Sequence, residues 1–249
     1  MRTVGVIPAR FASTRFPAKV LALIGGKPLI RHVWEKAVLC RELDEVLIAC
    51  DHKDIFQAAA DFKAKVVMTD PNHPSGSDRI AEAVKGLSAD IVVNIQGDEP
   101  FIDPGTIDSL SVLLKKDPST QMGTVIKEIS DEADFLNPNV VKCVVDEQGY
   151  ALYFSRSPIP YHRNKDLSSG VKNFKHLGLY AYRKDFLMQY KDWPKGALES
   201  AEELEQLRVL ERGIRIKTVK TGFESIAVDT PQDLEKAIKW YDKLRSIKV

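Results

Sequence analysis

Three cationic side chains lie close together near the start of the chain, at Arg10, Arg15 and Lys19, with Ser13 and Thr14 between them. Guanidinium groups offer planar forks and an ammonium offers a point charge, so this combination suits a chain of phosphates. The loop lacks both G-x-G-x-x-G and G-x-x-x-x-G-K-[ST], which argues against a nicotinamide or flavin site and against an ATPase loop. A solvated basic loop is the alternative, and the acidic positions downstream argue against it.

Two aspartates stand at chain reversals where neighbouring residues already begin the next helix. Asp98 follows the apolar run of residues 91–95, and Asp103 is placed to cap the helix after it. Asp229 precedes Thr230, which is placed to cap the last helix. A carboxylate that faces phosphates requires a cation between them, and Mg²⁺ is the usual one. The sequence therefore predicts a divalent cation beside Asp98.

Apolar, β-branched runs predict the strands that position these side chains. Residues 4–7 and 91–95 are typical of strands buried on both faces of a sheet. Helical periodicity between such runs, as in residues 29–38, predicts an α/β fold: a Rossmann-like, mostly parallel sheet with helices on both faces. Ligands of such sheets bind beyond the carboxyl ends of the strands, where Arg10 and Asp98 would lie.

Local capping signals predict two further helix starts. Ser77 is expected to cap a helix that runs to Val84. An S-x-x-E capping box at residues 200–203 predicts another helix, whose apolar stripe leaves Glu205 and Gln206 facing solvent by default.

A β excursion interrupts the strand–helix alternation in the second half of the chain. Residues 140–145 and 150–155, joined by a turn that contains glycine, predict an antiparallel hairpin. We interpret residues 1–249 as a single domain, with this excursion inserted at about 137–175 and suited to dimer contacts or a lid.

The composition excludes several classes of protein. The chain has 249 residues and a formal net charge of +1, so no global field recruits nucleic acid or an anionic membrane. Its three cysteines form no C-x-x-C pair, which argues against a disulfide framework and a zinc site. We find no signal segment and no apolar run long enough to span a bilayer, and we expect a cytoplasmic protein without membrane insertion.

Several motifs together closely resemble the 3-deoxy-manno-octulosonate cytidylyltransferases, or CMP-Kdo synthetases, where Kdo denotes the eight-carbon acidic sugar. The resemblance spans nearly the whole chain in order. Its matching blocks include Ile-Pro-Ala-Arg at 7–10, Gln-Gly-Asp-Glu-Pro at 96–100, Ser-Arg-Ser-Pro-Ile-Pro at 155–160, Leu-Glu-Gln-Leu-Arg at 204–208 and Val-Asp-Thr-Pro at 228–231.

The resemblance implies a fold of the nucleotide-diphospho-sugar transferase type and a nucleotidyltransferase reaction. CTP and Kdo would give CMP-Kdo and pyrophosphate for lipopolysaccharide synthesis, with Mg²⁺ held near Asp98 and Asp229. It also implies a homodimer built largely through the excursion. The catalytic set would be Arg10, Lys19, Asp98 and Asp229.

The resemblance further divides the binding residues into two sets. The nucleotide set would be Arg10, Ser13, Arg15, Lys19, Ser75, Gly76, Arg79 and Asp98. The sugar set would be Gln96, Arg156, His176, Tyr180, Glu205 and Gln206. We expect Arg156 to bind the sugar carboxylate, because a guanidinium fork matches that group. An ion pair at a dimer interface is the alternative role for Arg156, and a satisfied structural histidine is the alternative for His176.

The chain departs from the family pattern beside the loop lysine. Ala18 stands where glycine is usual, and Val20 stands where proline is usual. If position 18 requires a positive φ, alanine costs roughly 1 kcal/mol there. Milder departures are Ser77 for threonine and Ala181 for glycine. None of them removes a charged group.

Two other functions remain open from the sequence. A cytidylyltransferase for 8-amino-Kdo or a sialic acid would carry the same loop and aspartates, and only the sugar set separates these enzymes. A non-catalytic nucleotide-binding protein could share the fold, but Lys19, Asp98 and Asp229 argue against it.

Overall fold

The computed structural model describes residues 1–12, 15–163, 171–224 and 226–246. The chain divides into two compact units. The first unit comprises residues 1–108 with 224–249, and the second comprises residues 109–223. The helix α4 (Pro104–Lys116) contains the boundary between them. Ser13 lies outside the described residues. The expectation of one domain with an inserted excursion stays a prediction.

The first unit contains the parallel sheet that the apolar runs predict. Its strands lie in the order β6 (Ile91–Asn94), β1 (Thr3–Ala9), β4 (Glu45–Cys50) and β5 (Lys65–Met68). Every neighbouring pair among them is parallel. The strands β1 and β6 are almost wholly buried, as continuous β-branched runs require.

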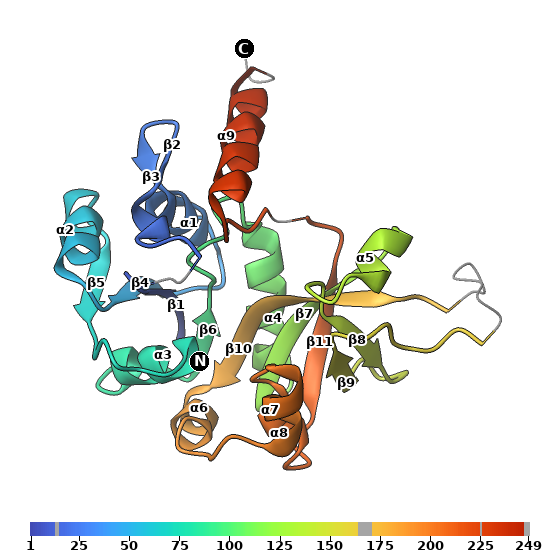
Figure 1. Cartoon of the computed structure of the whole chain (residues 1–249). Helices are drawn as coiled ribbons and strands as arrows, with labels where there is room; N and C mark the ends of the chain where they lie inside the picture. Colours follow the sequence, from blue (N-terminus) through green and yellow to red (C-terminus); the bar gives the residue numbers. More distant parts are fainter. Residues whose placement is uncertain (13–14, 164–170, 225, 247–249) are drawn as a thin grey trace. The chain divides into compact units, whose positions relative to one another are not determined.

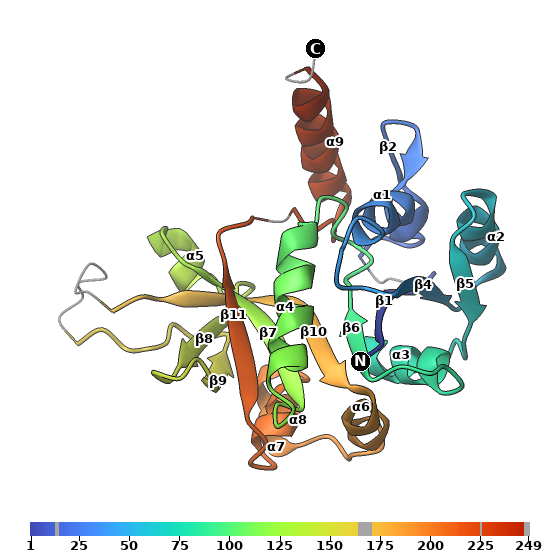
Figure 2. The same ribbon diagram turned by 180° about the vertical axis from the view of Figure 1, so that it is seen from behind.

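Helices cover both faces of this sheet. Figure 1 shows α3 on one side of the strands and α1 on the other, and Figure 2 shows the same arrangement from behind. The remaining elements of the first unit complete the crossovers and the end of the chain: 3₁₀ helix η1 (Lys19–Leu21), β2 (Leu23–Ile24), β3 (Lys27–Pro28), α1 (Leu29–Ala37), α2 (Lys53–Asp61), α3 (Gly76–Val84) and α9 (Pro231–Ser246). The predicted α/β class is therefore confirmed.

The second unit is built on a mixed sheet. The strand β7 (Met122–Glu128) pairs with β11 (Ile216–Thr221) in parallel and with β10 (Phe174–Arg183) antiparallel. The predicted hairpin is confirmed as β8 (Lys142–Val145) and β9 (Ala151–Ser155), and β8 pairs with β10. Its helices are α5 (Glu132–Leu136), α6 (Lys184–Tyr190), α7 (Ala197–Glu202) and α8 (Leu207–Leu210).

Two predicted helix starts are wrong. The helix α3 begins at Gly76 with Ser75 as its N-cap, not Ser77, because the Ser75 hydroxyl accepts from the backbone N–H of Asp78. The helix α7 begins at Ala197, upstream of the predicted capping box. Its first amides, at Leu198 and Glu199, donate to the Glu211 carboxylate, which lies far along the chain.

The described helices are all too short or too polar to cross a lipid bilayer.

Candidate active site

Lys19 lies between the two predicted metal-binding carboxylates. Its ammonium Nζ is 2.6 Å from Asp98 Oδ2 and 2.8 Å from Asp229 Oδ1. Burial opposes the charge on Lys19, but Asp98 and Asp229 outweigh that effect and raise its pKa. The lysine is therefore a fixed cation, and residues that lie 79 and 210 positions away in sequence meet at it.

The turns that carry the two carboxylates are bonded to each other. The backbone N–H of Val228 donates to the carbonyl of Asp98 at 2.9 Å. Asp98 follows Gly97, where a Cβ atom would come within 2.7 Å of the Pro8 carbonyl, so only glycine fits against β1. Thr230 and Asp233 form the predicted cap of α9, which leaves Asp229 to face Lys19.

The basic loop supplies further positive charge at this place. Arg15 Nη2 lies 3.2 Å from Asp229 Oδ2 and is largely exposed. Arg10 is exposed and makes no ion pair with any residue that the structure describes. Ala18 does adopt a left-handed conformation, with φ 54° and ψ 25°, immediately before Lys19. The loop therefore presents exposed guanidinium groups beside a lysine that two carboxylates hold.

The other nucleotide-set residues lie at the start of α3. Ser75 caps the helix, and Gly76 packs near the Pro8 ring, so both adjoin the end of β1. Arg79 is nearly buried, with 4% of its side chain exposed. Its guanidinium donates to Asp51 Oδ2 at 2.9 Å and to Thr69 Oγ1 at 2.6 Å. Gln96, the one sugar-set residue in this unit, is half-buried beside Gly97.

In the second unit, His176 and Tyr180 adjoin each other on β10. Their ring centroids are 5.2 Å apart, across an irregularity in the β7 pairing between Leu177 and Tyr180. The Thr124 hydroxyl donates its one proton to the carbonyl of Leu179, so it accepts from His176 Nε2 at 2.9 Å. Burial lowers the pKa of His176 to about 3. His176 is therefore a neutral imidazole protonated at Nε2.

Gln206 is buried, so the expectation that it faces solvent is wrong. The chain leaves α7 through Glu203 in a left-handed conformation, and Gln206 is 3% exposed. Tyr180 donates to Gln206 Oε1 at 3.1 Å, while Gln206 Nε2 has no hydrogen-bond partner among the residues that the structure describes. Glu205 accepts from the Tyr190 hydroxyl at 2.9 Å. An unpaired buried amide donor is costly unless a ligand satisfies it.

The guanidinium of Arg156 donates hydrogen bonds to three backbone carbonyl oxygens. Nε donates to Glu202, Nη1 to Pro138 and Nη2 to Glu203. A guanidinium has five N–H donors, so one remains on each terminal nitrogen. The Arg156 guanidinium makes no ion pair within the described part of the chain, and the Glu202 carboxylate accepts from the backbone N–H of Arg156 at 2.9 Å.

The donor set at Lys19 fits Mg²⁺. Asp98 and Asp229 each direct an oxygen at the same cation. No cluster of three potential ligands from His, Cys, Asp and Glu exists among the described residues. Mg²⁺ is commonly held by one or two carboxylates, with phosphate and water completing its shell. Two carboxylates beside the cations of the basic loop match that pattern.

Comparison with known proteins identifies the family of this chain. A family model described as cytidylyltransferase matches residues 4–216. A 3-deoxy-manno-octulosonate cytidylyltransferase of Geobacter sulfurreducens is 51% identical over 247 residues, covering 96% of this chain and 99% of that protein. This chain belongs to that cytidylyltransferase family. The corresponding protein of Solibacter usitatus is 50% identical, covering 96% of this chain and 94% of its own.

Solved structures that superimpose on this chain support the same family. A CMP:2-keto-3-deoxy-manno-octonic acid synthetase complexed with CTP superimposes with a TM-score of 0.93 at 41% identity, over 98% of this chain and 99% of that one. The 4-diphosphocytidyl-2C-methyl-D-erythritol synthase of Anaerococcus prevotii superimposes with a TM-score of 0.63 at 13% identity, over 97% and 99%. The second likeness shows the fold alone.

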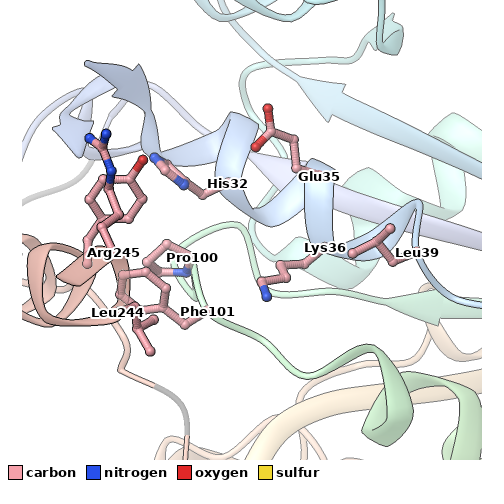
Figure 3. A pocket seen from close by; sticks show the side chains of 9 residues that line it. His32, Glu35, Lys36, Leu39, Pro100, Phe101, Leu244 and Arg245 are labelled. Carbon is pink, nitrogen blue, oxygen red and sulfur yellow. The ribbon is translucent and has the colours of Figure 1, made fainter. Parts of the chain in front are cut away.

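The cytidylyltransferase also has a cavity of about 380 Å³ away from the predicted site residues (Figure 3). Side chains of α1, of the turn at Pro100 and Phe101, and of α9 line it. None of the nucleotide-set or sugar-set residues is part of its lining.

From the sequence alone, no role was assigned to Asp51, which contacts both the basic loop and Arg79. Asp51 is 7% exposed and accepts from both Arg79 and the backbone N–H of Phe11. It ends β4 at the carboxyl edge of the sheet, where ligands of such folds bind. The position of Asp51 directly after a strand could have marked it in the sequence. Its partners Arg79 and Phe11 lie 28 and 40 residues away, so no local pattern showed these contacts.

Proposed function

We propose that this chain transfers the cytidylyl group of CTP to Kdo, forming CMP-Kdo and pyrophosphate in lipopolysaccharide synthesis. The observation that carries the proposal is Lys19 fixed between Asp98 and Asp229, with Arg10 and Arg15 on the same loop. Cations beside paired carboxylates suit a nucleoside triphosphate with its metal.

The chain's own residues would position the triphosphate and neutralise its charge. The anomeric hydroxyl of the sugar attacks the α-phosphorus, and the bond to pyrophosphate breaks. Arg10, Arg15 and Lys19 would stabilise the negative charge that grows on the leaving pyrophosphate. Such a transfer depends on alignment and electrostatics more than on covalent catalysis. Mg²⁺ held by Asp98 and Asp229 would supply further charge neutralisation at the phosphates.

The sugar set of the second unit supports an acidic sugar as acceptor. Arg156 keeps two N–H donors and an unpaired charge for a carboxylate, and Gln206 Nε2 is a buried donor in need of an acceptor. His176 is neutral, so at the sugar it would act by hydrogen bonding and shape, not by charge. The relatives at about 50% identity carry the name of the Kdo enzyme.

We also propose that the protein acts as a homodimer through the excursion at about 137–175. Three large apolar side chains of this segment are strongly exposed: Leu152 at 61%, Tyr161 at 82% and Val171 at 53%. Apolar groups gathered on one segment are typical of an interface.

Pyrophosphate release from purified protein with CTP and Mg²⁺ tests the proposed reaction. Parallel assays would contain Kdo, 8-amino-Kdo, a sialic acid or no sugar, with EDTA and Asp98→Ala as controls. We expect release with Kdo, lost on chelation and in Asp98→Ala.

Release only with another acidic sugar would show that this sugar, and not Kdo, is the acceptor. A near-normal kcat in Asp98→Ala would overturn the metal assignment. CTP binding without release for any sugar would favour a non-catalytic protein.

A further inference from the structure

Asp51 bonds to the chain where the basic loop begins after strand β1. Its Oδ1 accepts the backbone N–H of Phe11 at 2.8 Å, and Phe11 follows Arg10 directly. The Phe11 ring also stacks on His52, with centroids 3.9 Å apart and planes inclined by 22°. The carboxylate and the imidazole at the end of β4 therefore fix both the backbone and the ring of Phe11.

Phe11 also closes the loop on its other side. Its carbonyl accepts the backbone N–H of Ala18 at 2.9 Å, and Ala18 precedes Lys19. We call the bonded pair Phe11–Ala18 the neck of the loop. Because the neck joins the residue after Arg10 to the residue before Lys19, anything that fixes Phe11 also fixes the separation of these two cations.

Arg79 orients Asp51 from the helix α3. The two charged side chains are 4% and 7% exposed, and Arg79 Nη2 lies 2.9 Å from Asp51 Oδ2. Thr69 bonds the other terminal nitrogen and itself donates to the Cys50 carbonyl. Two N–H groups of Arg79 thus bond to the protein itself, which leaves Asp51 Oδ1 directed at Phe11.

We propose that Asp51 is a positioning residue for CTP, and that Arg79 acts on the nucleotide through Asp51 and the neck. The chain of contacts runs from Arg79 to Asp51, to Phe11, to Ala18, and so to Arg10 and Lys19. This inference rests on the proposed function in one respect, namely that the loop binds the phosphates of CTP.

A double-mutant cycle tests the route. Asp51→Asn keeps Oδ1 for Phe11 but directs an amide at Arg79, and Arg79→Gln leaves the buried Asp51 carboxylate without its cation. The double variant contains neither charge, and its two amides can bond to each other. CTP affinity is measured by calorimetry without sugar, so a failure of the proposed sugar transfer does not affect the result.

We expect each single variant to weaken CTP binding on the order of tenfold, because misplaced cations lose their alignment with the phosphates. Amide exchange, followed by NMR, should accelerate at Phe11 and Ala18. The double variant should bind CTP more tightly than Arg79→Gln does, with both amides protected again. Where turnover is measurable, the loss should lie in KM for CTP more than in kcat.

Arg208→Gln is the matched control, because Arg208 and Glu199 form a similarly buried ion pair within the second unit. It should leave amide exchange at Phe11 and Ala18 unchanged, while thermal melting confirms that every variant folds. A double variant as weak as Arg79→Gln would mean that Arg79 contacts the nucleotide directly and would overturn the proposal. Unchanged exchange at the neck in both single variants would overturn it as well.

Discussion

Ala18 is an alanine in a backbone conformation that favours glycine. Its φ of 54° confirms the positive value that the family comparison suggested for this position. The left-handed region costs a residue with a Cβ atom about 1–2 kcal/mol, whereas glycine enters it freely. The strain lies in the neck itself, immediately before Lys19, so it falls on the backbone that places the loop cation.

Ala18→Gly should therefore stabilise the protein. We expect the free energy of unfolding to rise by about 0.5–1 kcal/mol, because relief of strain exceeds the extra entropy that glycine loses on folding. Urea unfolding of both proteins measures the change. Ala22→Gly is the control, since Ala22 has a φ of −59° and gains nothing from glycine. Equal loss of stability in both variants would contradict the strain at position 18.

His176 should make stability depend on pH. Burial lowers its pKa from 6.5 to about 3, so the unfolded chain binds a proton that the folded protein excludes. The contribution is fully present above about pH 6.5 and is lost as the pH falls toward 3. Between pH 7.5 and 5.5 we expect His176 to account for about 1 kcal/mol of lost stability.

Urea unfolding of the wild type and His176→Gln at both pH values measures this contribution. Glutamine can still donate to Thr124 but does not titrate. A pH dependence that is the same in both proteins would show that His176 is not the responsible group.

At the scale of single residues, the sequence indicated which charged residues gather at one place better than it indicated their tertiary contacts. Lys19, Asp98 and Asp229 were selected because each follows a strand or precedes a cap, and the structure brings them together. The role of Asp51 and the burial of Gln206 depend on contacts between distant segments. No local pattern in the sequence records such contacts.

Among the elements, α3 offers a direct comparison of two candidate caps. Ser75→Ala should destabilise the protein by about 1 kcal/mol, because its hydroxyl accepts a free amide of the first turn. Ser77→Ala removes a hydroxyl of the same kind that accepts no capping bond, so it should cost less. Thermal or urea unfolding of the two variants gives the comparison. A larger loss in Ser77→Ala would contradict the observed helix start.

Elements with a strong local signal were predicted well. Continuous apolar runs identified β1 and β6, and Thr230 as a cap identified the start of α9. The capping box at 200–203 failed because Glu211 satisfies the first amides of α7 from beyond the next helix. The prediction of Ser77 as the cap of α3 failed because Ser75, two residues earlier, accepts the capping bond from Asp78.

For the whole molecule, the proposed dimer predicts a mass twice that of the chain. Leu152→Lys should shift the protein toward monomer in light scattering after gel filtration, because a buried ammonium opposes association. Leu39→Lys is the control, since Leu39 is 64% exposed and belongs to the first unit, not to the excursion. A monomeric wild type, or equal effects of both substitutions, would count against an interface at the excursion.

The Lys19 ammonium has a consequence for the kinetic order of binding. It pairs with both Asp98 and Asp229 before any substrate arrives, so a free divalent ion at the proposed metal site would have to compete with a cation that the chain itself tethers in place. A nucleotide that brings its own metal would remove this competition, because its phosphates would give the ammonium a new partner. Under the proposed function, we therefore expect metal and CTP to enter as one complex, with Lys19 limiting metal binding to the free protein.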